Sequence, residues 1–188
     1  MNAALRDRAI SQADARLHST QPGHPTNYQF QWTGERLLTV SQGKKERASW
    51  SETTGQSGEL ALLPPVPVLN AMANLFTTHD IKPWLTDYGV AATRQRLVLL
   101  DDRVCLVTGS DKPGQDAPQI WIEQITFLPR RFMFNMGSRR VSIALNDWHG
   151  PVTMGRFPYV IEIRLDGRPV FKLTTSTVYP VGSRGEVP

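Results

Sequence analysis

Short alternating apolar segments joined by turn residues fill the stretch from residue 95 to residue 179, and this pattern most constrains the fold. Alternation with a period of two is typical of a half-buried β-strand. Asp101-Asp102 and Asp166-Gly167 separate pairs of these segments, and both residue types favour tight hairpin turns. We therefore expect antiparallel strands, each paired with its neighbour in the sequence.

One of these segments, "PQIWIEQITFLPRRFMF" at 118–134, is interrupted by a Leu-Pro pair. Ile120 and Ile122 share one side of the alternation, and Phe132 and Phe134 resume that side after the interruption. We expect this strand to bend at Leu128-Pro129 and help to curl the sheet. Its apolar side then faces either a helix or a bound apolar ligand.

The first 90 residues combine both periodicities. Residues 3–17 carry Leu and Ala near helical spacing, which predicts an amphipathic helix followed by a loop. "NYQFQWTG" alternates Phe30 and Trp32 with polar residues, and two further strands are expected around a turn at 42–45. Residues 67–77 and 81–88 have apolar residues three and four apart, which predicts two short helices.

Together these elements predict an α+β, mainly antiparallel β, protein. About nine or ten strands form a curled, incomplete β-barrel covered by short helices, because a sheet this wide has to curl or close and its apolar face needs a cover. We expect a single domain over residues 1–180. Residues 1–26 would supply the N-terminal helix and loop, and residues 181–188 a flexible tail.

Composition excludes several classes of protein. With 40% hydrophobic and 20% charged residues the chain is typical of a globular domain, and no apolar run approaches the roughly 20 residues of a membrane helix. The net charge of +4 comes from scattered basic residues, so nucleic acid is not expected as a partner. Cys105, the single cysteine, lies in the apolar run "VCLVTG", which indicates a buried, inert thiol.

Residues with catalytic or metal-binding spacing are scarce. The four histidines lie far apart in the sequence, and no Gly-x-Ser-x-Gly or glycine-rich phosphate loop occurs. We therefore expect no catalytic residues, no metal site, no cofactor and no enzyme activity. The first 17 residues also lack the hydrophobic core of a signal peptide, so we expect either a cytoplasmic protein or a mature domain whose export signal is absent.

The order of segments in the second half carries a resemblance. "PQIWIEQITFLPRRFMF", then "VSIALNDWHGPVTMGRFPYVIEI", then "RLDGRPVFKLTTSTVY", resembles the C-terminal half of the LolA/LolB-like family of bacterial envelope proteins over roughly residues 95–180. The resemblance implies an incomplete antiparallel barrel folded over helices, with an apolar cavity that receives acyl chains. It further implies a periplasmic or outer-membrane-associated carrier for lipoprotein acyl chains or other lipids.

The partners implied are a lipid or an acylated protein, with transient contact to a membrane surface or to envelope proteins. An acyl site needs a concave apolar wall and few polar groups. The residues that we expect to line it are Phe30, Trp32, Leu38, Trp50, Leu69, Met72, Phe76, Trp84, Ile120, Ile122, Phe132 and Phe134. At each position the competing interpretation is plain core packing, because apolar residues at regular spacing are normally core.

Two other functions stay open at this stage. A protein-interaction module would have its helices packed tightly on the sheet with no cavity, and Trp121, on the polar side of its strand, would then be a candidate interface anchor. An enzyme on the same barrel would need a polar, titratable cluster inside the cavity.

Overall fold

Antiparallel strands form one open sheet in this computed structural model, which describes residues 10–18, 28–33, 37–77, 82–112, 116–148, 153 and 157–180. Within those ranges the sheet has twelve strands in the order β5-β4-β3-β2-β1-β12-β11-β10-β9-β8-β7-β6. The strands are β1 Ile10–His18, β2 Tyr28–Thr33, β3 Leu37–Gln42, β4 Lys45–Ser51, β5 Gly55–Gly58, β6 Gln95–Leu100, β7 Arg103–Thr108, β8 Gln119–Glu123, β9 Pro129–Met136, β10 Arg139–Asn146, β11 Val160–Leu165 and β12 Arg168–Pro180. The helices are η1 Leu60–Leu62, α2 Val66–Thr77 and α3 Lys82–Asp87.

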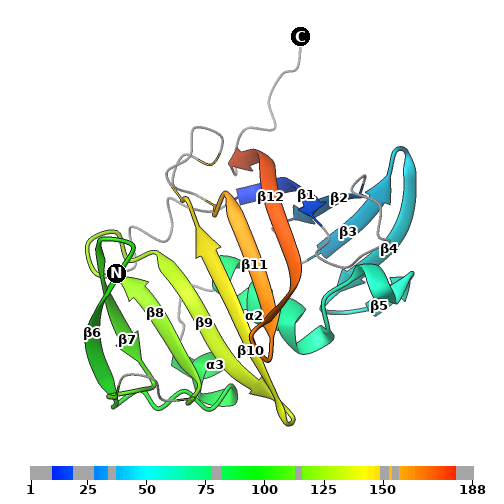
Figure 1. Cartoon of the computed structure of the whole chain (residues 1–188). Helices are drawn as coiled ribbons and strands as arrows, with labels where there is room; N and C mark the ends of the chain where they lie inside the picture. Colours follow the sequence, from blue (N-terminus) through cyan, green and yellow to red (C-terminus); the bar gives the residue numbers. More distant parts are fainter. Residues whose placement is uncertain are drawn as a thin grey trace.

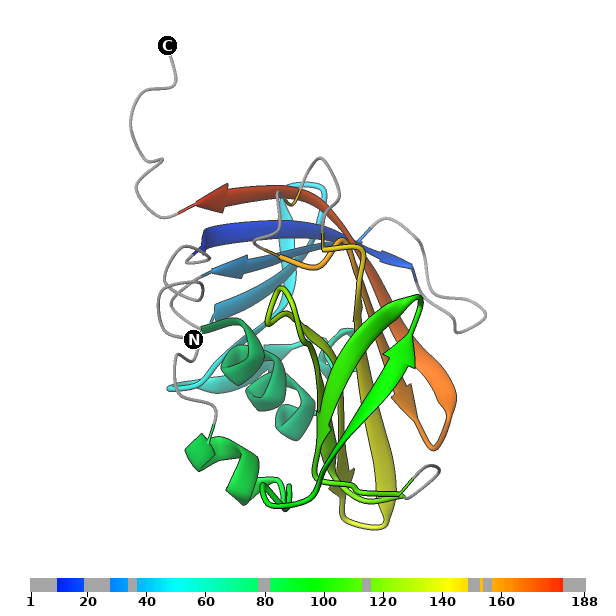
Figure 2. The ribbon, with the colours of Figure 1, turned by 90° about the vertical axis from the view of Figure 1, so that its left-hand side faces the viewer.

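The chain path explains where the helices lie. Strands β1 to β5 run outward to one edge of the sheet, and β6 to β12 return from the other edge until β12 pairs with β1. The helical segment connects the two edge strands, so it crosses the sheet on one side (Figure 1). Seen from the side, the sheet curls around α2, which lies between the β1–β4 part and the β9–β12 part (Figure 2). The incomplete, helix-covered barrel expected from the sequence is confirmed.

Tight hairpins hold neighbouring strands in register. Asp101 and Asp102 have φ of 49° and 60°, and Asp166 and Gly167 have φ of 52° and 78°. Positive φ at both central residues is what a two-residue turn needs to match the twist of its strands, and Asp and Gly tolerate that conformation. Both predicted hairpin turns are therefore confirmed.

The N-terminal helix expected over residues 3–17 is wrong for the part that the structure describes, because Ile10–His18 is strand β1. Ala13 and Ala15 are buried while Asp14 and Arg16 alternate with them toward the other face. Alanine fits either periodicity, and β1 fills the place between β2 and β12, where it hydrogen-bonds to both. The expected Leu5 and Ala9 lie outside the described residues.

Two further expectations about strands need correction. Residues 118–136 form two antiparallel strands, β8 and β9, rather than one bent strand, although Ile120 and Phe132 do lie opposite each other on the same face. Strand β5 was not predicted, because its sequence "GQSG" contains no apolar residue. Together with β1 and the division of 118–136 into two strands, it raises the number of described strands to twelve.

Both predicted helices are present, as α2 and α3. The residue spacing predicts one apolar face on α2, but the helix buries more than that face. Val68 and Ala71 are as inaccessible to solvent as Leu69 and Met72. It is thus enclosed on most sides, as expected for a helix held within a curled sheet. Among the residues described, no helix is long and apolar enough to cross a membrane.

Candidate functional site

Aromatic side chains gather where α2 meets the first half of the sheet. The rings of Trp32 in β2 and Trp50 in β4 stack with centroids 5.9 Å apart. Phe76 of α2 lies edge-on to Trp32 at 5.7 Å and contacts Phe157, which precedes β11, at 4.5 Å. The helix therefore inserts an aromatic side chain between the two halves of the sheet.

A second aromatic cluster lies under the end of α3. Phe132 and Phe134 of β9 stack at 5.2 Å, and the ring of Tyr88 meets both edge-on at 5.3 and 4.7 Å. The Tyr88 hydroxyl donates a hydrogen bond to the carbonyl of Pro67 at 3.0 Å, which connects the end of α3 to the first turn of α2. Burial, and to a lesser extent the charge of Asp87, raises the pKa of Tyr88 to about 12.

An apolar cavity remains between α2 and the sheet. Its volume is about 10 Å³, close to the smallest that can hold one water molecule. It is lined by Ala13, Ala15, Phe30, Trp32, Leu38, Met72, Phe157, Ile161 and Leu173. In this state the interior is filled by the protein's own side chains, with Met72 and Phe76 of α2 among them.

One polar atom in this apolar lining lacks a partner. The indole Nε1 of Trp32 is buried and has no hydrogen-bond acceptor among the described residues, and the whole side chain is only 3% exposed. A buried donor without an acceptor costs about 1–3 kcal/mol. A water molecule is a poor solution, because buried waters make about three hydrogen bonds and this lining offers little beyond that one N–H.

The structure brings most of the predicted site residues together in the interior, between α2 and the concave face of the sheet. Phe30, Trp32, Leu38, Trp50, Leu69, Met72, Ile120, Phe132 and Phe134 are buried, and Phe76 and Ile122 are partly buried against them. The backbone of Trp84 lies in α3, but its side chain lies outside the described part of the chain. Whether these residues bind a ligand stays a prediction.

Several interior residues were not predicted as site residues. Phe157, Ile161 and Leu173 line the cavity, and Tyr88 joins the second aromatic cluster. The alternation of β11 and β12 in the sequence does place Ile161 and Leu173 on an apolar face. Phe157 lies in an irregular segment, where no periodicity could indicate the direction of its side chain.

The apolar face continues beyond the helices, on the edge hairpin β6–β7. Leu97 and Leu99 are 61% and 67% exposed, and Val104, opposite Leu99, is 41% exposed. Leu97 pairs across to Leu106, and Leu106 to the partly buried Ile122, so this exposed patch is continuous with the interior wall. Large exposed apolar patches commonly mark interaction sites.

On the opposite, outer face, Trp121 is covered by cations on both sides. The guanidinium carbons of Arg96 and Arg131 lie 5.6 and 5.1 Å from its ring centroid, and its Nε1 donates to Gln119 at 3.2 Å. The side chain is only partly exposed. Trp121 does lie on the polar side, as predicted, but as the centre of a cation–π stack.

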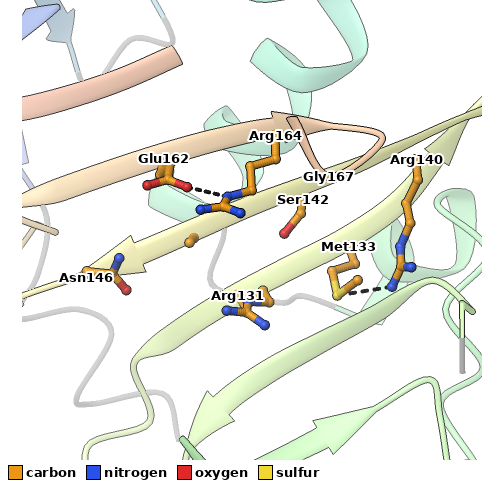
Figure 3. A pocket seen from close by; sticks show the side chains of 9 residues that line it. Arg131, Met133, Arg140, Ser142, Asn146, Glu162, Arg164 and Gly167 are labelled. Atoms are coloured by element: carbon orange, nitrogen blue, oxygen red, sulfur yellow. Dashed lines mark hydrogen bonds and ion pairs between the residues drawn. The ribbon is translucent and has the colours of Figure 1, made fainter. Parts of the chain in front are cut away.

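Next to this stack the outer face is hollowed into a groove of about 370 Å³. Its lining comes from β9, β10, β11 and the turn that follows β11, and consists of Arg131, Met133, Arg140, Ser142, Ala144, Asn146, Glu162, Arg164 and Gly167 (Figure 3). Arg164 pairs with Glu162, and Arg140 pairs with Asp116. Polar side chains dominate this groove, in contrast to the interior.

Buried charges also belong to the outer face. Glu123 is 2% exposed and pairs with Arg103 at 2.8 Å and with the buried Arg130 at 3.8 Å. Beside them is Cys105, which is buried as predicted, and burial raises the pKa of its thiol. Glu123 alternates along β8 with Ile122, so this cluster faces away from the apolar interior.

Comparison with solved structures identifies the architecture. The chain superposes over its whole length on the crystal structure of a LolA superfamily protein from Nitrosomonas europaea, covering 93% of that chain with a TM-score of 0.54 at 14% sequence identity. The fold is LolA-like. The resemblance predicted from the segment order is thus confirmed at the level of the fold, and it extends to the N-terminal half of the chain. No family model and no curated protein sequence matches this one.

Proposed function

We propose that this LolA-like protein binds acyl chains in its interior, in the space that α2 fills in the present structure. The observation that carries the proposal is the Nε1–H of Trp32 in an otherwise apolar wall. This buried donor has no hydrogen-bond acceptor among the residues that the structure describes. In a filled structural core such a group only lowers stability. An acyl ester or amide would supply both the missing acceptor, through its carbonyl oxygen, and the apolar chain that suits the wall.

The interior must open to accept a ligand, since sites for molecules of that size have volumes of roughly 300–1,000 Å³ and the cavity holds about 10 Å³. Helix α2 is the element to move, because it is not part of the strand ladder of the sheet and fills the interior with Met72 and Phe76. Methionine is flexible and adapts readily to a new neighbour. Displacement of α2 would leave the wall of Phe30, Trp32 and Leu38 in contact with the acyl chain.

The free energies of transfer permit an acyl chain to replace Met72 and Phe76 in the interior. Each methylene removed from water contributes about 0.8 kcal/mol, so ten methylenes contribute about 8 kcal/mol. Removing Met72 and Phe76 from the interior costs about 1.5–3 kcal/mol each on the same scale. A long acyl chain therefore outweighs the two side chains that it replaces, and a short one does not.

We further propose that the acyl chains belong to lipoproteins or other lipids and that the protein acts as a carrier in the periplasm or at the outer membrane. This part of the proposal is supported by the LolA-like fold alone. Fractionation of cells that express the natural gene would test the location. Recovery from the cytoplasm would contradict it without affecting the proposal that the interior binds acyl chains.

Native mass spectrometry with organic extraction tests ligand binding. We expect the purified protein to carry, or to take up from added palmitoyl glycerol, one acyl ligand per chain. Leu38→Gln places a polar group in the wall that would contact the acyl chain and should weaken uptake at least tenfold. Val66→Gln changes an exposed position on α2 and should leave uptake unchanged.

A second function is favoured by a separate observation. The filled interior, together with exposed Leu97, Leu99 and Val104, also fits a protein-interaction module that binds through the β6–β7 hairpin. Uptake experiments separate the two functions. No uptake of acyl ligands by a folded protein would overturn the carrier proposal and leave the interaction module as the better account.

A further inference from the structure

The groove on the outer face is formed by the sizes of the residues on three neighbouring strands. Ala144 of β10 lies between Arg131 of β9 and Glu162 of β11, and Ser142 lies between Met133 and Arg164. The small side chains of β10, between longer side chains of β9 and β11, leave the groove along β10. Its volume of about 370 Å³ is in the range of small-molecule sites.

The charge of the groove is predominantly positive. Three arginines, Arg131, Arg140 and Arg164, line it together with a single carboxylate, that of Glu162. They extend from three different strands over the same face (Figure 3). An anion in the groove would therefore be surrounded by guanidinium groups from several directions.

The guanidinium of Arg131 is available to bind such an anion. Its guanidinium lies over the ring of Trp121 at 5.1 Å, and among the described residues it has no hydrogen bond or ion pair. Burial lowers the pKa of this guanidinium, because desolvation outweighs the charges of Asp101 and Glu162, which act to raise it. A stacked guanidinium keeps its N–H edges available for two parallel hydrogen bonds to an oxyanion.

The geometry points to a binding site for a phosphate ester in this groove. A planar carboxylate is satisfied by one guanidinium, whereas a phosphate presents three or more oxygens in different directions and suits arginines that approach from β9, β10 and β11. The hydroxyl of Ser142 and the amide of Asn146 provide neutral donors between them. The volume leaves room for an organic group on the phosphate, either the headgroup of an anionic phospholipid or a small soluble ester.

This site is independent of the proposed acyl site. Arg131 and Ser142 occupy the opposite face of the sheet from Phe132 and Ile143, which face the interior. Loss of acyl binding would therefore leave the groove intact. Loss of phosphate binding would leave the interior intact in the same way.

Titration by NMR of the arginine Nε–H resonances, at constant ionic strength, tests the proposal. Glycerol 3-phosphate and inorganic phosphate should shift the Arg131 resonance saturably, and acetate should not do so at the same concentration. Arg164→Gln should weaken phosphate binding at least fivefold, and Arg131→Gln should weaken it further. Glu162→Gln should strengthen it several-fold, since it removes the one carboxylate of the groove.

Arg16→Gln is the matched control, because it removes one exposed arginine from β1, outside the groove. It should leave the affinity unchanged. Arg164→Gln keeps the test valid even where Arg131→Gln disturbs the Trp121 stack, since Arg164 is exposed and pairs only with Glu162 among the described residues. Shifts that do not saturate, or that weaken equally in Arg16→Gln and Arg164→Gln, would overturn the proposal.

Vesicles distinguish the two sources of the phosphate. Co-sedimentation with phosphatidylglycerol vesicles but not with phosphatidylcholine vesicles, reversed by glycerol 3-phosphate and lost in Arg164→Gln, would support a lipid headgroup. Saturable binding of glycerol 3-phosphate without vesicle binding would support a soluble ester. Binding of neither would overturn the site.

Discussion

Phe76 of α2 lies edge-on to Trp32 of β2, with ring centroids 5.7 Å apart and an interplanar angle of 82°. Edge-to-face pairs of this kind contribute about 0.5–1.5 kcal/mol beyond the area that they bury. Trp32 also has the buried indole N–H that lacks a hydrogen-bond acceptor among the described residues. One contact therefore links the helix that fills the interior to the residue that we propose to recognise the ligand.

Acyl-chain length should control affinity. Ten methylenes contribute about 8 kcal/mol, against about 3–6 kcal/mol for displacing Met72 and Phe76. We expect no measurable binding of six-carbon esters. Beyond about eight carbons we expect an increase of about fourfold in affinity per methylene. Competition against a fluorescent acyl probe measures this series, and affinity independent of chain length would contradict an interior site.

Phe76→Ala should separate stability from binding. Removal of this partly buried ring costs about 2 kcal/mol of unfolding free energy, less than a fully buried Phe. It also removes one of the groups that the ligand has to displace, so we expect acyl affinity to rise at least threefold. Denaturant unfolding and the same competition assay measure both effects. Phe76→Leu, which keeps most of the volume, should change affinity little, and weaker binding by Phe76→Ala would count against displacement of α2.

Glu123→Ala should destabilise the fold by about 3 kcal/mol. The substitution leaves the buried Arg130 with only the exposed Asp101 as an ion-pair partner among the described residues, and poorly compensated buried charge is costly. Chemical denaturation gives the change in unfolding free energy. Glu59→Ala is the control: it breaks a more exposed pair with Arg47, which should cost less than about 1 kcal/mol. Equal losses in the two variants would show that Glu123 is not electrostatically important.

Stability should fall in alkaline solution because of Tyr88. Its pKa is raised from the ordinary 10 to about 12, so between these values the unfolded chain releases a proton that the folded chain retains. The contribution is complete below pH 10 and is lost as the pH rises to about 12. We expect the wild type to lose about 1–2 kcal/mol more than Tyr88→Phe over that interval. Parallel losses in both proteins would show that Tyr88 ionises freely in the folded state.

The parts of the fold that sequence reasoning predicted correctly have a single dominant period. Ile120, Phe132 and Ile143 each lie in a clear alternation, and each occupies the expected interior face. Helix α2 was recognisable because its apolar residues recur three and four apart. Strand β1 was not, since Ala13 and Ala15 fit both periods and only the pairing with β2 and β12 decides between them.

The candidate sites were less accessible to sequence reasoning. Trp32 was predicted on the wall, but the missing acceptor for its N–H depends on what surrounds it in three dimensions. The outer groove depends on the register that places Ala144 between Arg131 and Glu162. These residues belong to three strands, and the local pattern of each strand contains no information about its neighbours' side chains.

The indole N–H resonance of Trp32, assigned with Trp32→Phe, tests the central claim most directly. Palmitoyl glycerol and hexadecyl glycerol have the same chain length and differ at the carbonyl. We predict that both bind, that the ester moves the Trp32 N–H resonance downfield as a new hydrogen bond forms, and that the ether moves it much less. Binding of both ligands with equal shifts would contradict carbonyl recognition by Trp32, and binding of neither would contradict the acyl site itself.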